Sequence, residues 1–203
     1  MTRSSKNGFT LIEVILVVLI SALVALAVYR IFAVAIKVNE KVQARAETVR
    51  ALMAVFCLVE RDLNNMVSYD FGVDSTLYAF SGSAQMIRMI IPTESGLKAV
   101  RYAFDETLGD FIRVEQPFVD FLSGEPMNEE DRQIIFSHPA LRSVQFLFGY
   151  LNTEEEREPL WKDQWQRNRL PFAVRLRLGV AENKSLSSFE RTIFVPHGDW
   201  GDL

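Results

Sequence analysis

Glu13 is the residue with the most unusual chemical setting, because it is a carboxylate inside an apolar segment. Residues 14–29 read VILVVLISALVALAVY, and Ser21 is their only clearly polar residue. As a helix this run is roughly 24 Å long, close to the ~30 Å hydrocarbon core of a bilayer. A charge in lipid is costly unless it is paired, so Glu13 is a candidate functional residue.

The segment before the apolar run is short, polar and basic. Residues 1–8 carry Arg3 and Lys6 and end in Gly8, which Phe9 follows. The apolar run exceeds the roughly 7–15 residues of a secretory signal peptide, and no small-x-small cleavage site with turn residues follows it. A plain membrane anchor fits the apolar run, but it would leave Glu13 unexplained.

The order K-N-G-F-T-L-I-E-V resembles the class III signal of type IV pilins and type II secretion pseudopilins. The resemblance implies that a prepilin peptidase cuts after Gly8 and N-methylates Phe9. It also implies that Glu13, the fifth residue of the mature chain, is the assembly residue. Cleavage leaves a cationic amine on Phe9, and in poorly hydrated surroundings Glu13 of an incoming subunit can neutralise the amine of its neighbour.

Charge alone does not orient the chain in a membrane. Basic residues stand on both sides of the apolar segment: Arg3, Lys6, Arg30, Lys37 and Lys41. The resemblance implies a single-pass protein in the inner membrane of a Gram-negative bacterium. Its leader would lie inside, and its C-terminal domain would lie in the periplasm.

The helical period continues beyond the apolar segment. Apolar residues recur mostly every three or four positions, at Val34, Val38, Val42, Val49, Leu52, Phe56, Val59, Leu63 and Met66. No Gly or Pro interrupts residues 9–66, and Ser68, Asp70 and Gly72 predict the end of the helix. We expect a leader over residues 1–8, a transmembrane part over 9–36, an amphipathic periplasmic part over 37–68, and a β-domain over 69–203. A coiled coil is the alternative for the amphipathic part.

After residue 72 the apolar period changes to two, which predicts strands. Candidate strands cover residues 77–80, 85–91, 97–104, 111–115, 141–151, 172–180 and 190–195. Turn residues separate them at 81–83, 94–96, 108–110 and 183–185. The predicted class is α+β, with a long N-terminal transmembrane and amphipathic helix packed on an antiparallel β-sheet domain, as in the pseudopilin fold.

Three further segments resemble the J-type minor pseudopilin of type II secretion. They are LVERDL with Arg61 and Asp62, VRY followed by FIRV with Tyr102 and Arg113, and a loop with Trp161 and Trp165 leading to LPFAV. The resemblance implies a tip complex with the I and K minor pseudopilins, which primes the major pseudopilin on an inner-membrane secretion platform and helps to export folded proteins. A minor pilin of a type IV pilus, serving adhesion, DNA uptake or motility, is the alternative.

Four of these side chains are candidates for partner contacts, each with a local alternative. Trp161 and Trp165 either line a contact with a neighbouring subunit, where tryptophan is enriched, or cover the domain's own core. Arg61 and Asp62 form a pair between or within subunits, or a solvated helix face. Cys57, the only cysteine, is expected to pack as a small apolar residue.

The remaining composition argues against an enzyme and against a nucleic-acid binder. The net charge is −4, whereas a nucleic-acid binder would show a basic face. His138 and His197 are the only histidines, and the sequence has no nucleophile motif, phosphate-binding loop or Cys/His cluster. Acidic residues gather at 124–131 and 153–158, but without the alternation of a calcium loop. We therefore expect no catalytic residue, no metal and no cofactor.

Overall fold

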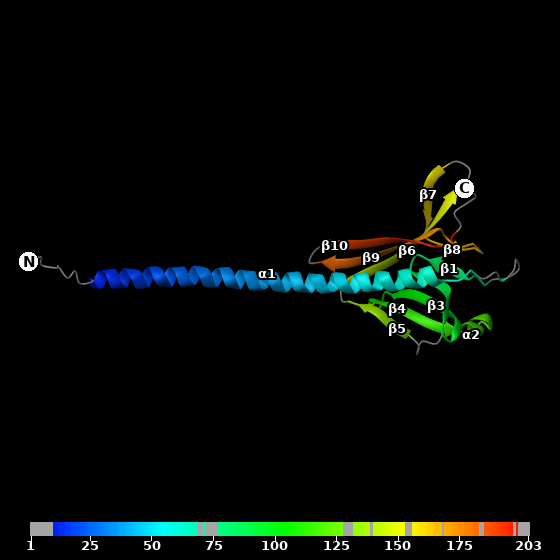
Figure 1. Ribbon diagram of the computed structural model, residues 1–203, viewed down its shortest axis with the longest axis horizontal. Coiled ribbons are helices and arrows are strands. Elements are labelled where there is room, and N and C mark those ends of the chain that lie inside the picture. The colour runs from blue at the N-terminus through cyan, green and yellow to red at the C-terminus, as the bar shows by residue number, and fades with distance from the viewer. Residues whose placement is uncertain are drawn as a thin grey trace, which may run out of the picture. The chain divides into compact units, whose positions relative to one another are not determined.

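The computed structural model describes residues 10–68, 71, 77–127, 132–138, 140–152, 156–167, 169–182, 185–196 and 198. The chain forms two compact units, Met1–Arg50 and Ala51–Leu203. Figure 1 shows the order of the elements along the chain. Gly8 and Phe9 lie outside the described residues.

The first element is one continuous helix, α1, over Leu11–Asn65. The apolar run of α1 belongs to the first compact unit of the chain, and the last turns of the helix belong to the second. The absence of Gly and Pro explains its continuity, since these two residues interrupt helices most strongly. Asn64 and Asn65 close it, so it ends slightly before the expected residue 68.

The second unit contains two antiparallel sheets where the sequence predicted one sheet domain. The six-stranded sheet has the order β5-β4-β3-β2-β1-β8. Its strands are β1 (Phe80–Ser83), β2 (Met86–Thr93), β3 (Gly96–Asp105), β4 (Asp110–Pro117), β5 (Arg132–Ser137) and β8 (Trp165–Gln166). A short helix, α2 (Phe118–Leu122), follows β4.

The second sheet has four strands in the order β10-β9-β6-β7. Its strands are β6 (Leu141–Asn152), β7 (Glu156–Lys162), β9 (Ala173–Glu182) and β10 (Ser185–Phe194). Val174, Leu176 and Leu178 alternate with Arg175 and Arg177 along β9, and only the aliphatic set is fully buried. This alternation is the period of two that predicted the strand.

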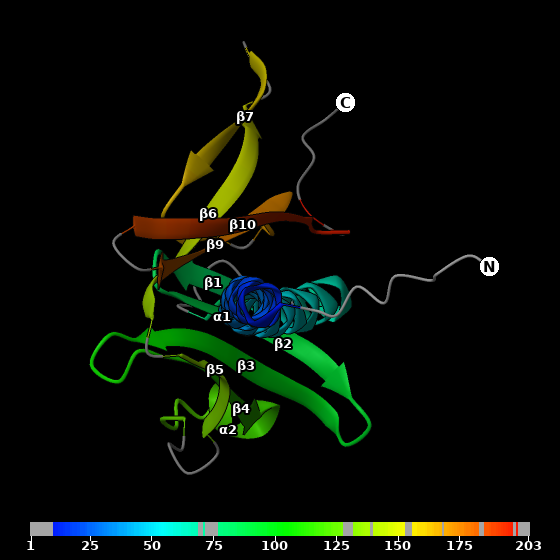
Figure 2. The same cartoon turned by 90° about the vertical axis from the view of Figure 1, so that its left-hand side faces the viewer.

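The main core joins the last turns of α1 to both sheets. Five helix residues spaced by one to four positions are 0–2% exposed: Leu52, Val55, Phe56, Val59 and Leu63. They share a cluster with Ile87, Met89 and Val100 of the large sheet and with Phe146 and Phe148 of the small one. Figure 2 shows the C-terminal turns of α1 between the strands of the two sheets. The apolar face of α1 is therefore covered by this domain between Leu52 and Leu63, whereas Val38 and Val42, which belong to the same apolar period, are more than half exposed.

A smaller apolar cluster covers the opposite face of the large sheet. Ala79, Ile90 and Ala99 pack there against Phe121 of α2. Ile90 and Ala99 are opposite each other in the pairing of β2 with β3, so both point to this outer face. The large sheet is thus buried on both sides near its centre.

The α+β class and the long N-terminal helix are confirmed, while several local predictions were wrong. Residues 81–83 are not a turn but part of β1, and the turn lies at Ala84 and Gln85. The proposed acidic loop at 153–158 runs into β7, which begins at Glu156. Strands β5, β7 and β8 and helix α2 were not predicted, because none of them carries a long alternating pattern.

The two sheets approach each other closely at Gly82 of β1. A Cβ atom added to this glycine would lie 2.3 Å from Cζ of Phe148 on β6. Phe148 cannot withdraw easily, because it is fully buried and its ring packs against Phe80 and Trp165 at centroid distances of 5.7 and 6.4 Å. Glycine is therefore required here for close packing between the sheets.

Candidate functional site

Glu13 lies in the first turn of α1, where its carboxylate caps the helix. Oε2 accepts hydrogen bonds from the backbone N–H and the hydroxyl of Thr10, each at 3.3 Å. An acid in the first turn also interacts favourably with the helix dipole. Both bonds are long, and Oε1 has no hydrogen bond within the described part of the chain. The carboxylate therefore retains capacity for a further cationic partner.

The apolar residues that follow Glu13 are exposed in the isolated chain. In the described residues, α1 is the one helix long and apolar enough to cross a membrane, and none of its most apolar window is buried in the protein. Side chains such as Leu19, Leu23 and Phe32 are more than half exposed. A surface of this kind is stable in contact with lipid or with other apolar helices, not with water.

A second polar cluster joins α1 to the large sheet through Asp62. Its side chain is 2% exposed, and Oδ2 accepts a hydrogen bond from the Tyr102 hydroxyl at 2.6 Å and from Arg113 Nε at 2.9 Å. Arg61 reaches the other oxygen of Asp62 from solvent, with Nη2 at 3.2 Å and its own side chain 62% exposed. The three segments LVERDL, VRY and FIRV thus meet at one point.

The network continues from Arg113 to the edge of the domain. Arg113 donates to Glu115 through Nη1, and Lys98 donates to the other oxygen of Glu115 at 2.6 Å. Charges therefore alternate from Asp62 through Arg113 and Glu115 to Lys98. The network is buried at its helix end, whereas the side chains of Lys98 and Glu115 are 31% and 33% exposed.

These contacts shift the pKa values of three members of the network, which are Tyr102, Arg113 and Glu115. Burial raises the pKa of Tyr102, and the Asp62 charge beside it raises it further, so the phenol stays a donor. Burial lowers the pKa of Arg113, but the bond to Glu115 and the charge of Asp62 outweigh burial and hold that pKa above its ordinary value. Burial raises the pKa of Glu115, yet the bonds from Lys98 and Arg113 hold it below its ordinary value. Arg113 and Glu115 therefore stay charged and Tyr102 stays neutral at neutral pH.

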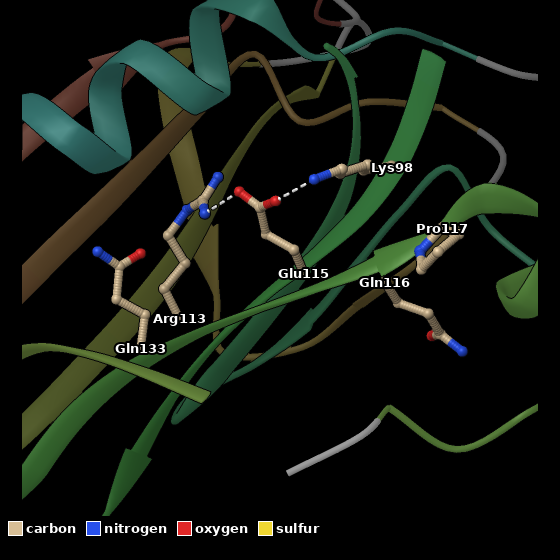
Figure 3. Close-up of a pocket in the computed structure, with 6 residues that line it drawn as sticks. All are labelled: Lys98, Arg113, Glu115, Gln116, Pro117 and Gln133. Carbon is tan, nitrogen blue, oxygen red and sulfur yellow. Dashed lines mark hydrogen bonds and ion pairs between the residues drawn. The ribbon is translucent and has the colours of Figure 1, made fainter. Parts of the chain in front are cut away.

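A cavity of about 430 Å³ lies beside the network. Its lining residues are Lys98, Arg113, Glu115, Gln116, Pro117 and Gln133. In Figure 3 the charged ends of Arg113, Glu115 and Lys98 point to the same side, while Gln116 points away from them. The charges here pair with one another, so the arrangement indicates a structural network.

The two candidate tryptophans differ in their surroundings. Trp165 is 3% exposed, packs in the main core and donates through Nε1 to the backbone oxygen of Arg169 at 2.7 Å. Trp161 is half-buried, with the Arg175 guanidinium 3.9 Å from its ring centroid and Phe172 beside it. The structure therefore places Trp165 in the domain's own core, whereas part of the Trp161 side chain is accessible to a partner.

Asp62 and Arg61 also differ in their surroundings, because Asp62 is buried and Arg61 is exposed. The carboxylate of Asp62 lies within the domain, bonded to its own chain, and is not part of a solvated helix face. Arg61 remains exposed beside it. Cys57 is exposed instead of packing inside, because it lies on the side of α1 away from the main core. A partner contact stays a prediction for Arg61 and Trp161.

The described residues form no cluster of three or more His, Cys, Asp or Glu side chains that could hold a metal ion. His138 has a local structural contact, since its Nδ1 accepts a hydrogen bond from the backbone N–H of Ala140 at 3.1 Å. His197 and the acidic residues 128–131 and 153–155 lie outside the described residues.

Two family models match the chain and together cover residues 3–190. Residues 30–190 match the family described as type II secretion system (T2SS), protein J, and residues 3–29 match the prokaryotic N-terminal methylation motif. The chain belongs to the protein J family of the type II secretion system. A search for similar curated proteins found no match.

Membership makes the chain a minor pseudopilin of type II secretion, in a family of structural proteins that interact with other pseudopilins. The apolar helix fits membrane anchoring of such a protein. The family match favours this assignment over a type IV pilus minor pilin, which shares the N-terminal motif.

The sequence failed to assign a role to Tyr102 and Arg113 of this J-family chain. Both residues stood in segments that resembled the family, yet nothing in the strand pattern connected them with Asp62, which is 40 and 51 positions away in sequence. The available signal was a polar residue at each of three otherwise apolar sites. Buried polar groups need partners, so three such sites could have been matched with one another.

Proposed function

We propose that the chain enters the inner membrane with residues 1–8 in the cytoplasm and its β-domain in the periplasm. The prepilin peptidase then cuts between Gly8 and Phe9 and methylates the new amine of Phe9. Residues 9–36 hold the subunit in the bilayer until it is assembled. The chain is thus a substrate of the processing enzyme and carries no catalysis of its own.

We propose further that the assembled chain belongs to the tip of the pseudopilus. There it joins the I and K minor pseudopilins, primes addition of the major pseudopilin on the inner-membrane platform, and supports export of folded proteins across the outer membrane. The observation that carries this proposal is the succession of the methylation motif at residues 3–29 and the protein J family at 30–190. Exposed Arg61 and half-buried Trp161 are the candidate contacts.

Glu13 provides the electrostatic step of assembly in this scheme. Its carboxylate stands at the start of an apolar helix, and only weak bonds from Thr10 satisfy one of its oxygens. An unpaired charge at the membrane is costly, and a methylated amine on Phe9 of a neighbouring subunit is a cation that can pair with it. When the subunit moves from lipid into a filament, its Glu13 carboxylate pairs with the Phe9 amine of its neighbour, so neither charge remains unpaired.

The test is a deletion strain complemented with the wild-type chain. We expect the deletion to abolish secretion of folded proteins into the medium and the wild-type gene to restore it. Co-purification of the full chain in detergent should recover the I and K pseudopilins. A deletion strain that secretes normally but loses surface pili would contradict the proposal and favour the type IV pilus alternative.

A further inference from the structure

The outer face of the large sheet carries a row of arginines that the assembly function does not use. In the strand register Arg88 of β2 lies opposite Arg101 of β3, Arg101 lies opposite Val114 of β4, and Val114 lies opposite Arg132 of β5. Side chains opposite each other in a sheet share a face, so the three guanidinium groups occur in one row. This row is basic in a chain whose net charge is −4.

Arg88 is the end of this row that lacks a carboxylate among the described residues. Arg132 at the other end pairs with Asp105 at 3.1 Å and lies 3.7 Å from Asp110. Arg88 instead lies over the ring of Phe121, 5.4 Å from its centroid, and its Nε is buried without a hydrogen bond. Burial lowers the pKa of Arg88, and the charge of Arg101 lowers it further. The fold therefore places the two arginines opposite each other on neighbouring strands.

A cavity of about 560 Å³ opens over the Arg88 end of the row. Arg88, Arg101 and Gln116 supply its polar lining, and apolar residues complete it: Leu77, Met86, Phe121, Pro126 and Met127. Glu125 also lines it, but the hydrogen bonds that Glu125 makes are through its backbone N–H and its carbonyl, which accepts from Gln116 at 2.8 Å. The lining thus combines guanidinium donors with apolar walls.

We propose that this cavity binds an acidic side chain of a partner protein, with its carboxylate on Arg88 and its apolar neighbours against Met86 and Phe121. A guanidinium binds a carboxylate through two parallel hydrogen bonds, and the terminal nitrogens of the half-buried Arg88 are the donors that a partner's carboxylate would meet. The apolar walls favour a peptide segment over a free inorganic anion, which would use the arginines alone. The inference rests on the proposed assembly function only in taking the partner to be a protein of the pseudopilus.

The first arm of the test is site-specific photo-crosslinking of the full chain in secreting cells. Met86 is replaced by p-benzoylphenylalanine, and exposed Ser188 of β10 carries the same group as a control. We expect an adduct from position 86 with one protein, at a segment that contains Asp or Glu. Arg88→Gln should lower its yield about tenfold or more, because a hydrogen bond to a charged group contributes about 1.5–3 kcal/mol. Arg88→Glu combined with Lys at the partner's acidic position should restore it.

Three results would overturn the proposal: no protein adduct from position 86, an adduct only with lipid or a second copy of this chain, or a yield that Arg88→Gln leaves unchanged. If the adduct depends on Arg88 but its partner is not a pseudopilus protein, the binding site is confirmed and only the link to the proposed assembly function fails. If secretion depends on the chain but no adduct forms at position 86, the proposed function stands and the proposed binding site is refuted.

The second arm excludes a purely structural role for Arg88. Arg88→Gln removes both a like-charge neighbour of Arg101 and a cation–π contact with Phe121, and these effects oppose each other, so the midpoint of thermal unfolding should change little. Arg177→Gln is the matched control, because Arg177 pairs with Glu190 on the exposed face of the other sheet. A larger fall of the midpoint in Arg88→Gln than in Arg177→Gln would assign Arg88 to stability and overturn the proposal.

Discussion

Replacing Asp62 by asparagine should destabilise the domain far more than the same change at an exposed carboxylate. Asp62 Oδ2 accepts from Tyr102 at 2.6 Å and from Arg113 at 2.9 Å, with side-chain exposures of 2% and 6% for Asp62 and Arg113. Breaking a buried pair costs about 3–5 kcal/mol. Glu115 still neutralises part of the Arg113 charge, so we expect a loss of about 2–4 kcal/mol. This is a large part of the ~5–15 kcal/mol that stabilises a typical domain.

Glu190→Gln is the matched control, because the hydrogen bonds of Glu190 are about as short as those of Asp62 but the residue is exposed to solvent. Glu190 Oε2 accepts from Arg177 Nη2 at 2.7 Å, with side-chain exposures of 37% and 40%. Such surface pairs contribute only about 0–1 kcal/mol. The double variant Asp62→Asn with Arg113→Met removes both buried charges, so it should lose less than the sum of the two single changes by about 1–3 kcal/mol.

The assay is urea unfolding of the full chain in detergent micelles, followed by near-ultraviolet circular dichroism. That signal reports the packing of aromatic residues, which here lie mainly in the β-domain. Two results would refute the reasoning: a cost for Asp62→Asn no larger than for Glu190→Gln, or strict additivity of the double variant. Either would mean that the network does not hold α1 on the large sheet.

Three further predictions, made with four variants, test other parts of the fold. Glu115 has a folded-state pKa below its unfolded value of about 4.3, so its stabilising effect is present above that pH and is lost as pH falls through the lowered value. Glu115→Gln should therefore make the thermal midpoint fall less steeply as the pH is lowered below about 4.3. Gly82→Ala should cost about 1–3 kcal/mol because its Cβ would meet Phe148, and an unchanged urea midpoint would contradict this. Trp165→Ala should lower the free energy of unfolding by about 3–5 kcal/mol, and Trp161→Ala should lower it clearly less. Equal losses in urea unfolding would contradict the different burial of the two side chains.

The long elements of the fold could be predicted because their patterns are strong and local. The apolar run, its continuation every three or four residues, and the alternation along β9 each fix an element without reference to the rest of the chain. Strands β5 and β7 could not be predicted in this way. Residues 132–137 alternate poorly, since β5 is an edge strand with Ile134 exposed, and β7 begins in an acidic segment.

The functional residues also differ in whether their neighbours in space are close in sequence. The motif around Glu13 is contiguous, so adjacent residues are enough to show its resemblance to the class III signal, and the resemblance implies its chemistry. The network of Asp62, Tyr102 and Arg113 depends on how β3 and β4 stack against α1, which no local pattern reveals. The same limit applies to Arg88 and Arg101, whose opposition follows only from the register of β2 on β3.

The most direct test of the account is the fate of a Glu13→Val chain in secreting cells, with Ser21→Val as the control in the same apolar segment. Both chains should insert, and intact-mass measurement should find both cut after Gly8 and methylated at Phe9. The account predicts that the amount of Glu13→Val chain in isolated pseudopili falls about tenfold or more, since a charge near lipid is left unpaired. Incorporation of Glu13→Val at the level of Ser21→Val and wild type would contradict the central claim.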